Sequence, residues 1–190
     1  LLSYLQTPPM IWFGLALVSL SVFWIQQHTF SWKDVTLFII SLAGIFYIGR
    51  GVTWSPYHRL ELIERTISTG AENSSVTTWY TLNIQQVFYQ SAMDLSEAFL
   101  ASLPEANQEL ENAVYSYNLP YRLHPPGDQV LIVGAGMGND AAAALRNGAE
   151  HVDAVEIDPA ILAFGQEFHP EHPYSDPRVT TIVDDARSYF

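Results

Sequence analysis

The chain contains no cysteine and only one lysine, Lys33, among its 190 residues. The absence of cysteine excludes a disulfide framework, a thiolate metal site and a cysteine nucleophile. Eight basic residues stand against twenty acidic ones, for a formal net charge of −12. This acidic excess argues against nucleic acid as the main partner, because phosphates are bound by Lys and Arg. With 48% hydrophobic and 15% charged residues, the chain is not a mainly disordered one.

Charge is also missing from the beginning of the chain, where no Asp, Glu, Lys or Arg precedes Lys33. The stretch Met10–Ile25 is almost wholly apolar and, with its flanks, reaches the roughly 20 residues that a membrane-spanning helix needs. A second, shorter apolar run covers Val35–Gly49. A pair of buried helices in a soluble protein is the alternative. The pattern predicts a transmembrane helical hairpin in residues 1–50, with helices at about 8–27 and 32–50.

The distribution of charge predicts an orientation for this hairpin. Arg50 and Arg59 follow the second apolar run, and basic residues favour the cytoplasmic side of a membrane. We therefore expect a membrane protein whose residues 51–190 lie in the cytoplasm. The chain starts at Leu1 without a methionine and stops at Phe190 directly after an apparent strand, so we expect it to be a fragment of a longer protein.

A small polar domain is predicted for residues 51–125. Turn-forming residues separate two short segments that are predicted to be strands, the second of them rich in β-branched and aromatic residues. Apolar residues at four-residue spacing then predict two helices, and a group of prolines that begins at Pro120 is expected to break the chain. The predicted strands are Tyr57–Glu64 and Val76–Ile84, and the predicted helices are Ser91–Leu103 and Glu105–Tyr117.

A glycine-rich turn follows in residues 126–190. The apolar run Gln129–Val133 is typical of a parallel strand buried on both faces. It leads into Gly134, Gly136 and Gly138 and then into a helix-forming stretch, Ala141–Arg146. This order is that of the first unit of a nucleotide-binding α/β fold. A dinucleotide-binding pattern would need glycine at position 139, where the chain has Asn139. The spacing of the glycines therefore favours an adenosyl-sulfonium ligand over NAD.

Acidic residues follow the next two predicted strands. Val152–Glu156 ends in Glu156, 22 positions after Gly134, where a carboxylate can accept hydrogen bonds from both ribose hydroxyls. Val179–Val183 is followed by Asp184 and Asp185. A carboxylate at that strand end is placed to bind an adenine amino group, although Asp185 is also a good helix N-cap.

From about residue 55 to residue 190 the chain resembles the spermidine/spermine synthase family, in particular the branch with transmembrane helices fused in front. That family consists of aminopropyltransferases built on the class I S-adenosylmethionine-dependent methyltransferase fold. The resemblance implies a small β domain followed by the first half of a Rossmann-like, doubly wound α/β sheet, truncated at Phe190. It is carried by Ser55–Leu62, Phe88–Gln90, Val130–Gly138, Val155–Pro159, Asp176–Val179 and Asp185–Ala186.

The resemblance also implies ligands and roles. Decarboxylated S-adenosylmethionine would be the donor, or S-adenosylmethionine the cofactor, with a polyamine such as putrescine as the acceptor. Gly134, Gly136 and Gly138 would wrap the nucleoside, Glu156 would hold the ribose, and Asp185 with Ala186 would hold the adenine. Tyr89 and Gln90 would lie in the substrate cleft. The chain departs from the family at Met137, where the family has Asp, and at His58, where it has Gln. We hypothesise that Asp140 replaces the lost charge from the first turn of the helix; the alternative is an acidic residue that the helix dipole favours there.

The family's catalytic base lies on the loop after the fourth strand, so we expect it beyond Phe190. No metal site is expected: His169 and His172 flank Glu171, but a surface loop is the favoured interpretation. Two other functions stay open, namely an S-adenosylmethionine-dependent methyltransferase and a non-catalytic nucleoside-binding membrane protein. A homo-oligomeric assembly is left open too.

Overall fold

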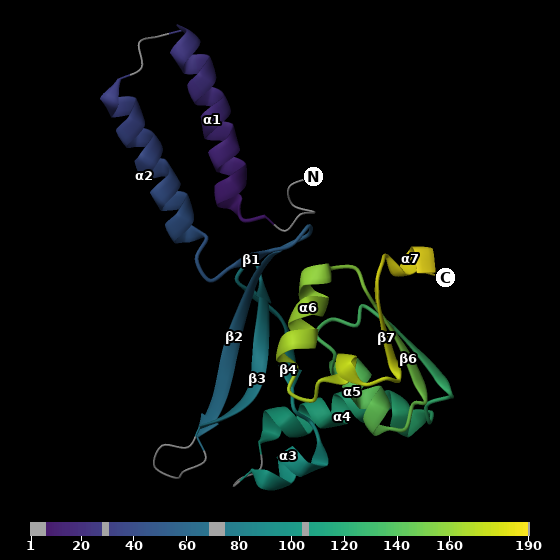
Figure 1. Ribbon diagram of the computed structural model, residues 1–190. Coiled ribbons are helices and arrows are strands. Elements are labelled where there is room, and N and C mark those ends of the chain that lie inside the picture. The colour runs from purple at the N-terminus through teal and green to yellow at the C-terminus, as the bar shows by residue number, and fades with distance from the viewer. Residues whose placement is uncertain (1–6, 28–30, 69–74, 104–106, 190) are drawn as a thin grey trace. The chain divides into compact units, whose positions relative to one another are not determined.

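The computed structural model describes residues 7–27, 31–68, 75–103 and 107–189. The chain forms two compact units, Leu1–Glu61 and Leu62–Phe190, with the boundary inside strand β2 (Figure 1). The first unit holds helices α1 (Pro9–Gln27) and α2 (Trp32–Ile48) and strand β1 (Thr53–Trp54). The division of the chain at residues 50 and 125 that the sequence predicts stays a prediction.

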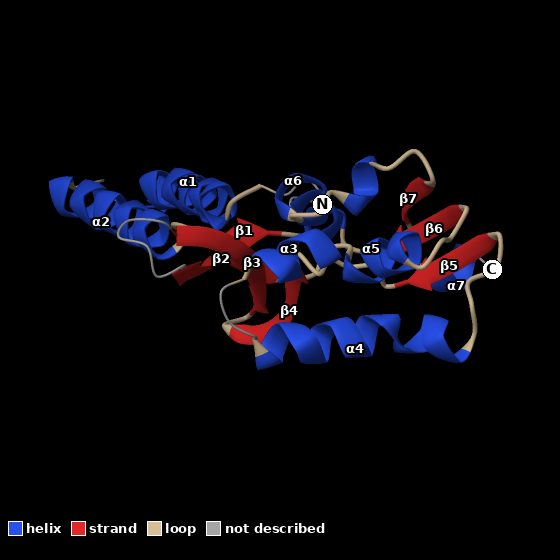
Figure 2. Cartoon of the chain, turned by 90° about the horizontal axis from the view of Figure 1, so that it is seen from below, coloured by secondary structure: helices blue, strands red, loops and turns tan. Residues whose placement is uncertain are grey.

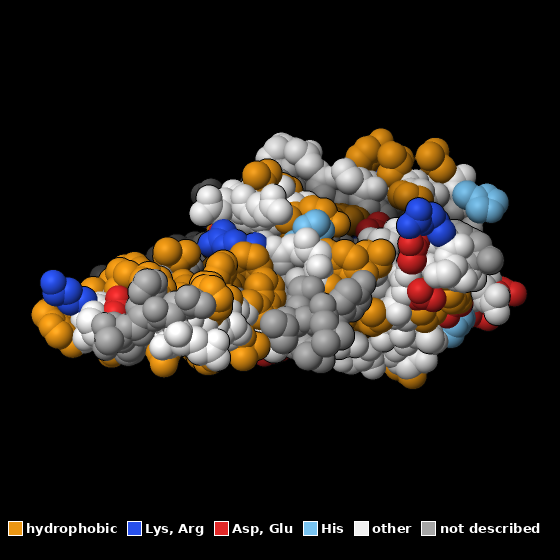
Figure 3. Space-filling view, turned by 90° about the horizontal axis from the view of Figure 1, so that it is seen from above, with side chains coloured by type: hydrophobic (Ala, Val, Ile, Leu, Met, Phe, Trp, Pro, Cys, Tyr) orange, Lys and Arg blue, Asp and Glu red, His pale blue; other side chains and the backbone are white. Residues whose placement is uncertain are grey.

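Helices α1 and α2 carry apolar side chains on nearly all sides. Phe13, Leu20 and Phe23 of α1 are 54%, 60% and 63% exposed, and hydrophobic side chains cover much of the visible surface of this region (Figure 3). Among the described residues, one helical segment, Pro9–Gln26, is long and apolar enough to cross a membrane, with a mean hydropathy of 1.6. Helix α2 has 17 residues. The structure thus supports one apolar candidate span, and the hairpin of two spans stays a proposal.

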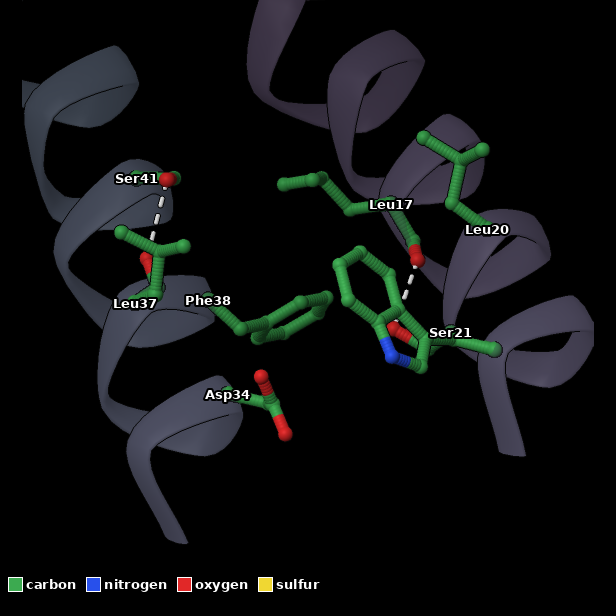
Figure 4. Close-up of a pocket in the computed structure, with 8 residues that line it drawn as sticks. Leu17, Leu20, Ser21, Asp34, Leu37, Phe38 and Ser41 are labelled. Carbon is green, nitrogen blue, oxygen red and sulfur yellow. Dashed lines mark hydrogen bonds between the residues drawn. The ribbon is translucent and has the colours of Figure 1, made fainter. Parts of the chain in front are cut away.

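A cleft of about 140 Å³ opens between α1 and α2 (Figure 4). Its serine hydroxyls are occupied within their own helices, because Ser21 donates to the carbonyl of Leu17 and Ser41 to that of Leu37. Asp34 caps the start of α2, where its Oδ2 accepts the N–H of Ser31 at 2.8 Å. Hydrogen bonds to the local backbone thus account for the polar groups of Ser21, Asp34 and Ser41. The residues predicted to bind the nucleoside belong to the second unit. The cleft is lined by Leu17, Leu20, Ser21, Trp24, Asp34, Leu37, Phe38 and Ser41.

Strand β1 pairs antiparallel with the start of β2 (Arg59–Ser68) through a tight turn. The hydroxyl oxygen of Ser55 accepts the N–H groups of Tyr57 and His58 at 3.1 and 2.8 Å. The predicted strand start at Tyr57 is therefore wrong by two residues, because Ser55 holds Tyr57 and His58 in the turn.

Strands β3 (Ser75–Ile84) and β4 (Val87–Met93) form an antiparallel hairpin, and the sheet has the order β1-β2-β3-β4. The predicted helix start at Ser91 is wrong, because Ser91 pairs with Thr81 in the sheet and helix α3 (Glu97–Ser102) begins only after Ser96. The side chain of Ser96 accepts the N–H of Phe99, a typical N-cap bond.

Helix α4 (Gln108–Leu123) begins after Asn107, whose side chain accepts the N–H groups of the first turn; the predicted start, Glu105, lies outside the described residues. Pro120 was expected to end this helix, yet it lies inside it. Tyr117 and Tyr121 on either side of Pro120 make tertiary contacts with the second half of the chain. These contacts hold the last turn in place although proline removes one backbone donor.

The last part of the chain forms a parallel sheet of β5 (Gln129–Val133), β6 (His151–Glu156) and β7 (Val179–Val183), in that order (Figure 2). A mixed α/β architecture is confirmed. Helix α5 (Asn139–Arg146) begins two residues before its predicted start, and its alanines pack on β5 and β6 in one apolar core. The remaining elements are helices α6 (Pro159–Phe168) and α7 (Ala186–Tyr189) and the short 3₁₀ turn η1 (Pro173–Ser175).

Candidate functional site

The glycine loop joins β5 to α5 and has a backbone that only glycine adopts readily. Gly134, Gly136 and Gly138 have φ values of +74°, +58° and +111°, in the region that side chains with a Cβ avoid. A Cβ at Gly136 would overlap the side-chain amide of Gln90, and one at Gly138 would lie 2.9 Å from Pro173. Local conformation and close packing thus both require glycine in this loop.

Glu156, at the end of β6, lies under the centre of the loop. Its side chain is only 4% exposed. Oε2 accepts the N–H of Gly136 and Oε1 accepts the N–H of Asp158, both at 2.9 Å. Because β5 and β6 are parallel neighbours, their carboxyl ends meet at one sheet edge. This register is the reason that the predicted ribose residue and the predicted glycine loop meet.

Gln90 reaches the same loop from strand β4. Its Oε1 accepts the N–H of Met137 at 3.3 Å. Its Nε2 is buried and has no hydrogen-bond partner among the described residues. A buried amide donor without an acceptor is costly, so this atom marks a place where a ligand oxygen or ring nitrogen would fit.

Tyr89 lies at an irregularity of the β3–β4 hairpin. The register of β3 and β4 shifts between Leu82, which pairs with Gln90, and Asn83, which pairs with Phe88. Tyr89 is therefore the extra residue of a β-bulge, a feature that redirects side chains. Partial burial raises the pKa of the Tyr89 hydroxyl, and the negative charges of Glu156 and Asp158 raise it further. Tyr89, next to Gln90 in sequence, thus lies within the electrostatic influence of Glu156, the carboxylate bonded to the loop.

Five consecutive amide groups of the loop are bonded to protein acceptors. Gly134 and Ala135 donate to the carbonyl of Val155, at 2.9 and 3.0 Å, and Gly138 donates to Ala135 at 3.1 Å. Gly136 donates to Glu156 and Met137 to Gln90. A loop that binds phosphate presents its N–H groups to the ligand. Here the same groups are engaged by the protein, and a buried carboxylate lies among them.

A second segment supports the loop from the other side. The hydroxyl of Tyr174 donates to the carbonyl oxygens of Ala135 and Gly136, at 2.9 Å each. Burial raises the pKa of this hydroxyl far above its ordinary value, so it stays a donor. A Cβ at Gly165 of α6 would lie 2.5 Å from the carbonyl oxygen of Met137. The loop is therefore packed tightly between α6 and η1.

Asn139 and His169 form a buried polar network next to the loop. Nε2 of His169 lies 3.0 Å from Oδ1 of Asn139, and Nδ1 of His169 accepts the N–H of Glu171 at 3.1 Å. Burial, with the positive charges of Arg146 and His172, lowers the pKa of His169 to about 3. The imidazole is therefore neutral, with its proton on Nε2.

The surface loop predicted around His169 is thus wrong in part. His169 is fully buried and Glu171 forms an ion pair with Arg146 at 2.5 Å, whereas His172 is exposed. Contacts with Asn139 and Arg146 of α5 bury the segment around His169. These contacts are distant in sequence, so no local pattern predicts them. Within the described ranges, no group of three or more His, Asp or Glu side chains is arranged to hold a metal ion.

The other predicted site residues are placed as follows. Asp140 is exposed in the first turn of α5, and desolvation by the surrounding protein raises the pKa of its carboxyl. Burial raises the pKa of Tyr117 and Tyr121, and the charge of Asp140 raises both further. Asp185 accepts the N–H of Arg187 and pairs with its guanidinium, which lowers the pKa of Asp185 to about 2. The backbone bond gives Asp185 the helix N-cap role that the sequence left open beside adenine binding. Ala186 opens α7, and His58 belongs to the first unit.

Comparison with known proteins finds a partial relationship to transferases. No family model matches the chain. Polyamine aminopropyltransferase of Pectobacterium carotovorum is 33% identical over 76 residues, which are 38% of this chain and 26% of that protein. The polyamine aminopropyltransferases of Pectobacterium atrosepticum and Serratia proteamaculans are 32% identical over the same shares. The match thus spans about a quarter of the length of these relatives.

Two solved structures are also similar in part. A candidate RNA methyltransferase of Pyrococcus horikoshii is 25% identical with a TM-score of 0.35, over 50% of this chain and 45% of that one. Phosphoethanolamine N-methyltransferase 2 of Haemonchus contortus, in complex with S-adenosyl-L-methionine, is 17% identical with a TM-score of 0.28, over 77% and 38%. At these TM-scores neither structure carries an argument. The partial similarity to polyamine aminopropyltransferases supports a spermidine synthase-like relationship, and membrane fusion is no part of it.

Proposed function

We propose that the chain is the donor-binding part of a membrane-associated, spermidine synthase-like aminopropyltransferase. The observation that carries the proposal is the engagement of the loop amides from Gly134 to Gly138 by protein acceptors, with the buried carboxylate of Glu156 at their centre. Such a loop repels a phosphate and favours a neutral or cationic nucleoside. The partial similarity to polyamine aminopropyltransferases agrees with a sulfonium nucleoside.

The residues of the site fit such a ligand. Glu156 would accept hydrogen bonds from the ribose hydroxyls, and the unpaired Nε2 of Gln90 would donate to a ligand acceptor. The glycines allow close approach of the ligand to the backbone. Binding of the adenine by Asp185 and Ala186 remains part of the proposal.

The acceptor would be a polyamine such as putrescine, drawn to an acidic region. Asp140 and Tyr89 are proposed to contact it, since carboxylates and aromatic faces both attract ammonium groups. In the reaction, an uncharged amine nitrogen forms a bond to the aminopropyl carbon next to sulfur. The carbon–sulfur bond breaks with its electron pair left on sulfur, which yields methylthioadenosine. The proton released from nitrogen passes to a general base.

Calorimetric titration of the full chain in detergent tests this proposal. The ligands are decarboxylated S-adenosylmethionine, intact S-adenosylmethionine and NAD as the phosphate-bearing control. We expect tightest binding of the decarboxylated donor and none of NAD. Glu156→Gln should weaken nucleoside binding at least roughly tenfold, because a charge-assisted bond is lost, whereas Glu111→Gln on the exposed side of α4 should have no effect. Preference for the intact cofactor would favour methyl transfer, and binding of NAD alone would contradict the proposal.

Attachment to the membrane is proposed separately, from the apolar helix α1 and the apolar run that forms α2. We propose that both helices span the bilayer and that the α/β part lies on the cytoplasmic side, next to Arg50 and Arg59. The chain should stay in the membrane fraction after carbonate extraction. In inside-out vesicles, protease should degrade residues 51–190. Release by carbonate, or protection of the α/β part, would contradict this topology.

A further inference from the structure

We infer that Asn139 is a positioning residue that holds Gln90 on the glycine loop. Asn139 stands where a dinucleotide-binding pattern would have its last glycine. Its side chain is 6% exposed and uses all of its hydrogen-bonding capacity. Oδ1 accepts the N–H of Met93 at 3.0 Å and faces Nε2 of His169 at 3.0 Å. Nδ2 donates to the carbonyl of Ser91 at 2.5 Å and to the hydroxyl of Tyr117 at 2.9 Å.

The two backbone bonds show what the side chain does to β4. The carbonyl of residue i and the N–H of residue i+2 point to the same side of a strand, and these are the groups of Ser91 and Met93 that Asn139 binds. The carboxamide therefore pairs with β4 as the backbone of a neighbouring strand would. Since β4 is last in the order of its sheet, Asn139 occupies part of an open strand edge.

This pairing sets the position of Gln90 relative to the loop. Gln90 directly precedes Ser91, and Asn139 lies two residues after Met137, whose N–H Gln90 accepts. The Gln90–Met137 contact and the Asn139–Ser91 contact together join two consecutive residues of β4 to the glycine loop and the start of α5. Tyr117 and His169 hold the carboxamide from α4 and from the segment after α6. Loss of the Asn139 amide would free β4 to shift and would release Gln90 from Met137.

Hydrogen exchange tests the inference in the ligand-free full chain. In Asn139→Ala and in Asn139→Asp, which keeps the size but loses both donors, the Met137 amide should exchange roughly fivefold faster than in wild type. Gln90→Ala should give a similar acceleration, and adding Asn139→Ala to it should give little more. The Leu162 amide of α6, bonded to Asp158, should keep its rate. Asn118→Ala, which removes a carboxamide bonded to Asn147 and Val114, is the matched control and should leave Met137 unchanged.

Two results would overturn the inference: an unchanged Met137 rate in both Asn139 variants, or equal acceleration of Met137 and Leu162, which would show general loosening only. The consequence for ligand binding rests on the proposed function and is measured with methylthioadenosine. Asn139→Ala should weaken its binding in the wild-type background and have little effect once Gln90 is alanine. Failure of the wild type to bind methylthioadenosine would contradict the proposed function, while the exchange rates would still decide the role of Asn139.

Discussion

The buried, neutral His169 predicts a measurable loss of stability in mild acid. Its pKa is about 3 in the folded chain, against an ordinary value of 6.5. Between these two values the unfolded chain binds a proton that the folded chain does not. Stability rises with pH wherever the unfolded state binds more protons, so this contribution is complete above pH 6.5 and declines as the pH falls toward 3.

The magnitude follows from the two pKa values. Linkage gives a loss of about 2 kcal/mol between pH 7 and pH 5, and of about 4 kcal/mol between pH 7 and pH 3. A loss of 2 kcal/mol corresponds to a roughly 25-fold fall in the folding equilibrium constant. A domain of ordinary stability has about 5–15 kcal/mol in total, so the effect is large.

Hydrogen exchange of core amides in β6 measures this effect in the full chain. The N–H of Val152, bonded to the carbonyl of Arg178 at 2.8 Å, is a suitable reporter, and its protection factor removes the intrinsic pH dependence of exchange. From pH 7 to pH 5, protection in wild type should fall by about 25-fold more than in His169→Gln, which cannot take up the proton. Because the other histidines are present in both chains, comparing wild type with His169→Gln removes their contribution to the pH dependence of stability. The same pH dependence in both would refute the argument.

Three further predictions concern packing and surface charge. Gly165→Ala should destabilise the fold by roughly 1–3 kcal/mol, because its Cβ would overlap Met137 and Tyr174; an unchanged melting temperature would contradict this. Leu110→Ala should lower the free energy of unfolding by about 2–5 kcal/mol, since Leu110 is fully buried. Urea unfolding measures this, and a smaller loss would show that the surrounding side chains collapse into the cavity. Arg187→Gln should leave the melting temperature unchanged, because its side chain is 90% exposed; a large fall would show that the Asp185 pair matters to the fold.

Residues that are close in sequence account for most of what was predicted correctly. Strands β5 and β7 have the predicted bounds, and β6 begins one residue earlier, at His151. Continuous apolar runs, glycine and an acidic strand end are local signals, and parallel pairing brings the two strand ends together. For this reason the sequence predicted that Glu156 and the glycine loop belong to one site, and the contact between Glu156 and Gly136 agrees with it.

The errors occur where a local signal competed with a distant contact. Ser91 to Met93 suit a helix start by spacing alone, but pairing with β3 makes them a strand. Pro120 suits a helix end, but tertiary contacts of its neighbours keep it inside α4. His169 in a proline-rich stretch suits a surface loop, but packing against α5 buries it.

The α/β class could be predicted without the structure, and so could the apolar helix, the glycine loop and its carboxylate, because each depends on composition or on spacing along one or two elements. The folded chain was needed to show that protein acceptors engage the five loop amides from Gly134 to Gly138, that Tyr89 is a bulge residue, and that Asn139 joins β4 to α5. The physical reason is that a hydrogen bond depends on distance and direction in space. Asn139 has partners at positions 91, 93, 117 and 169, and only the folded chain brings those positions together.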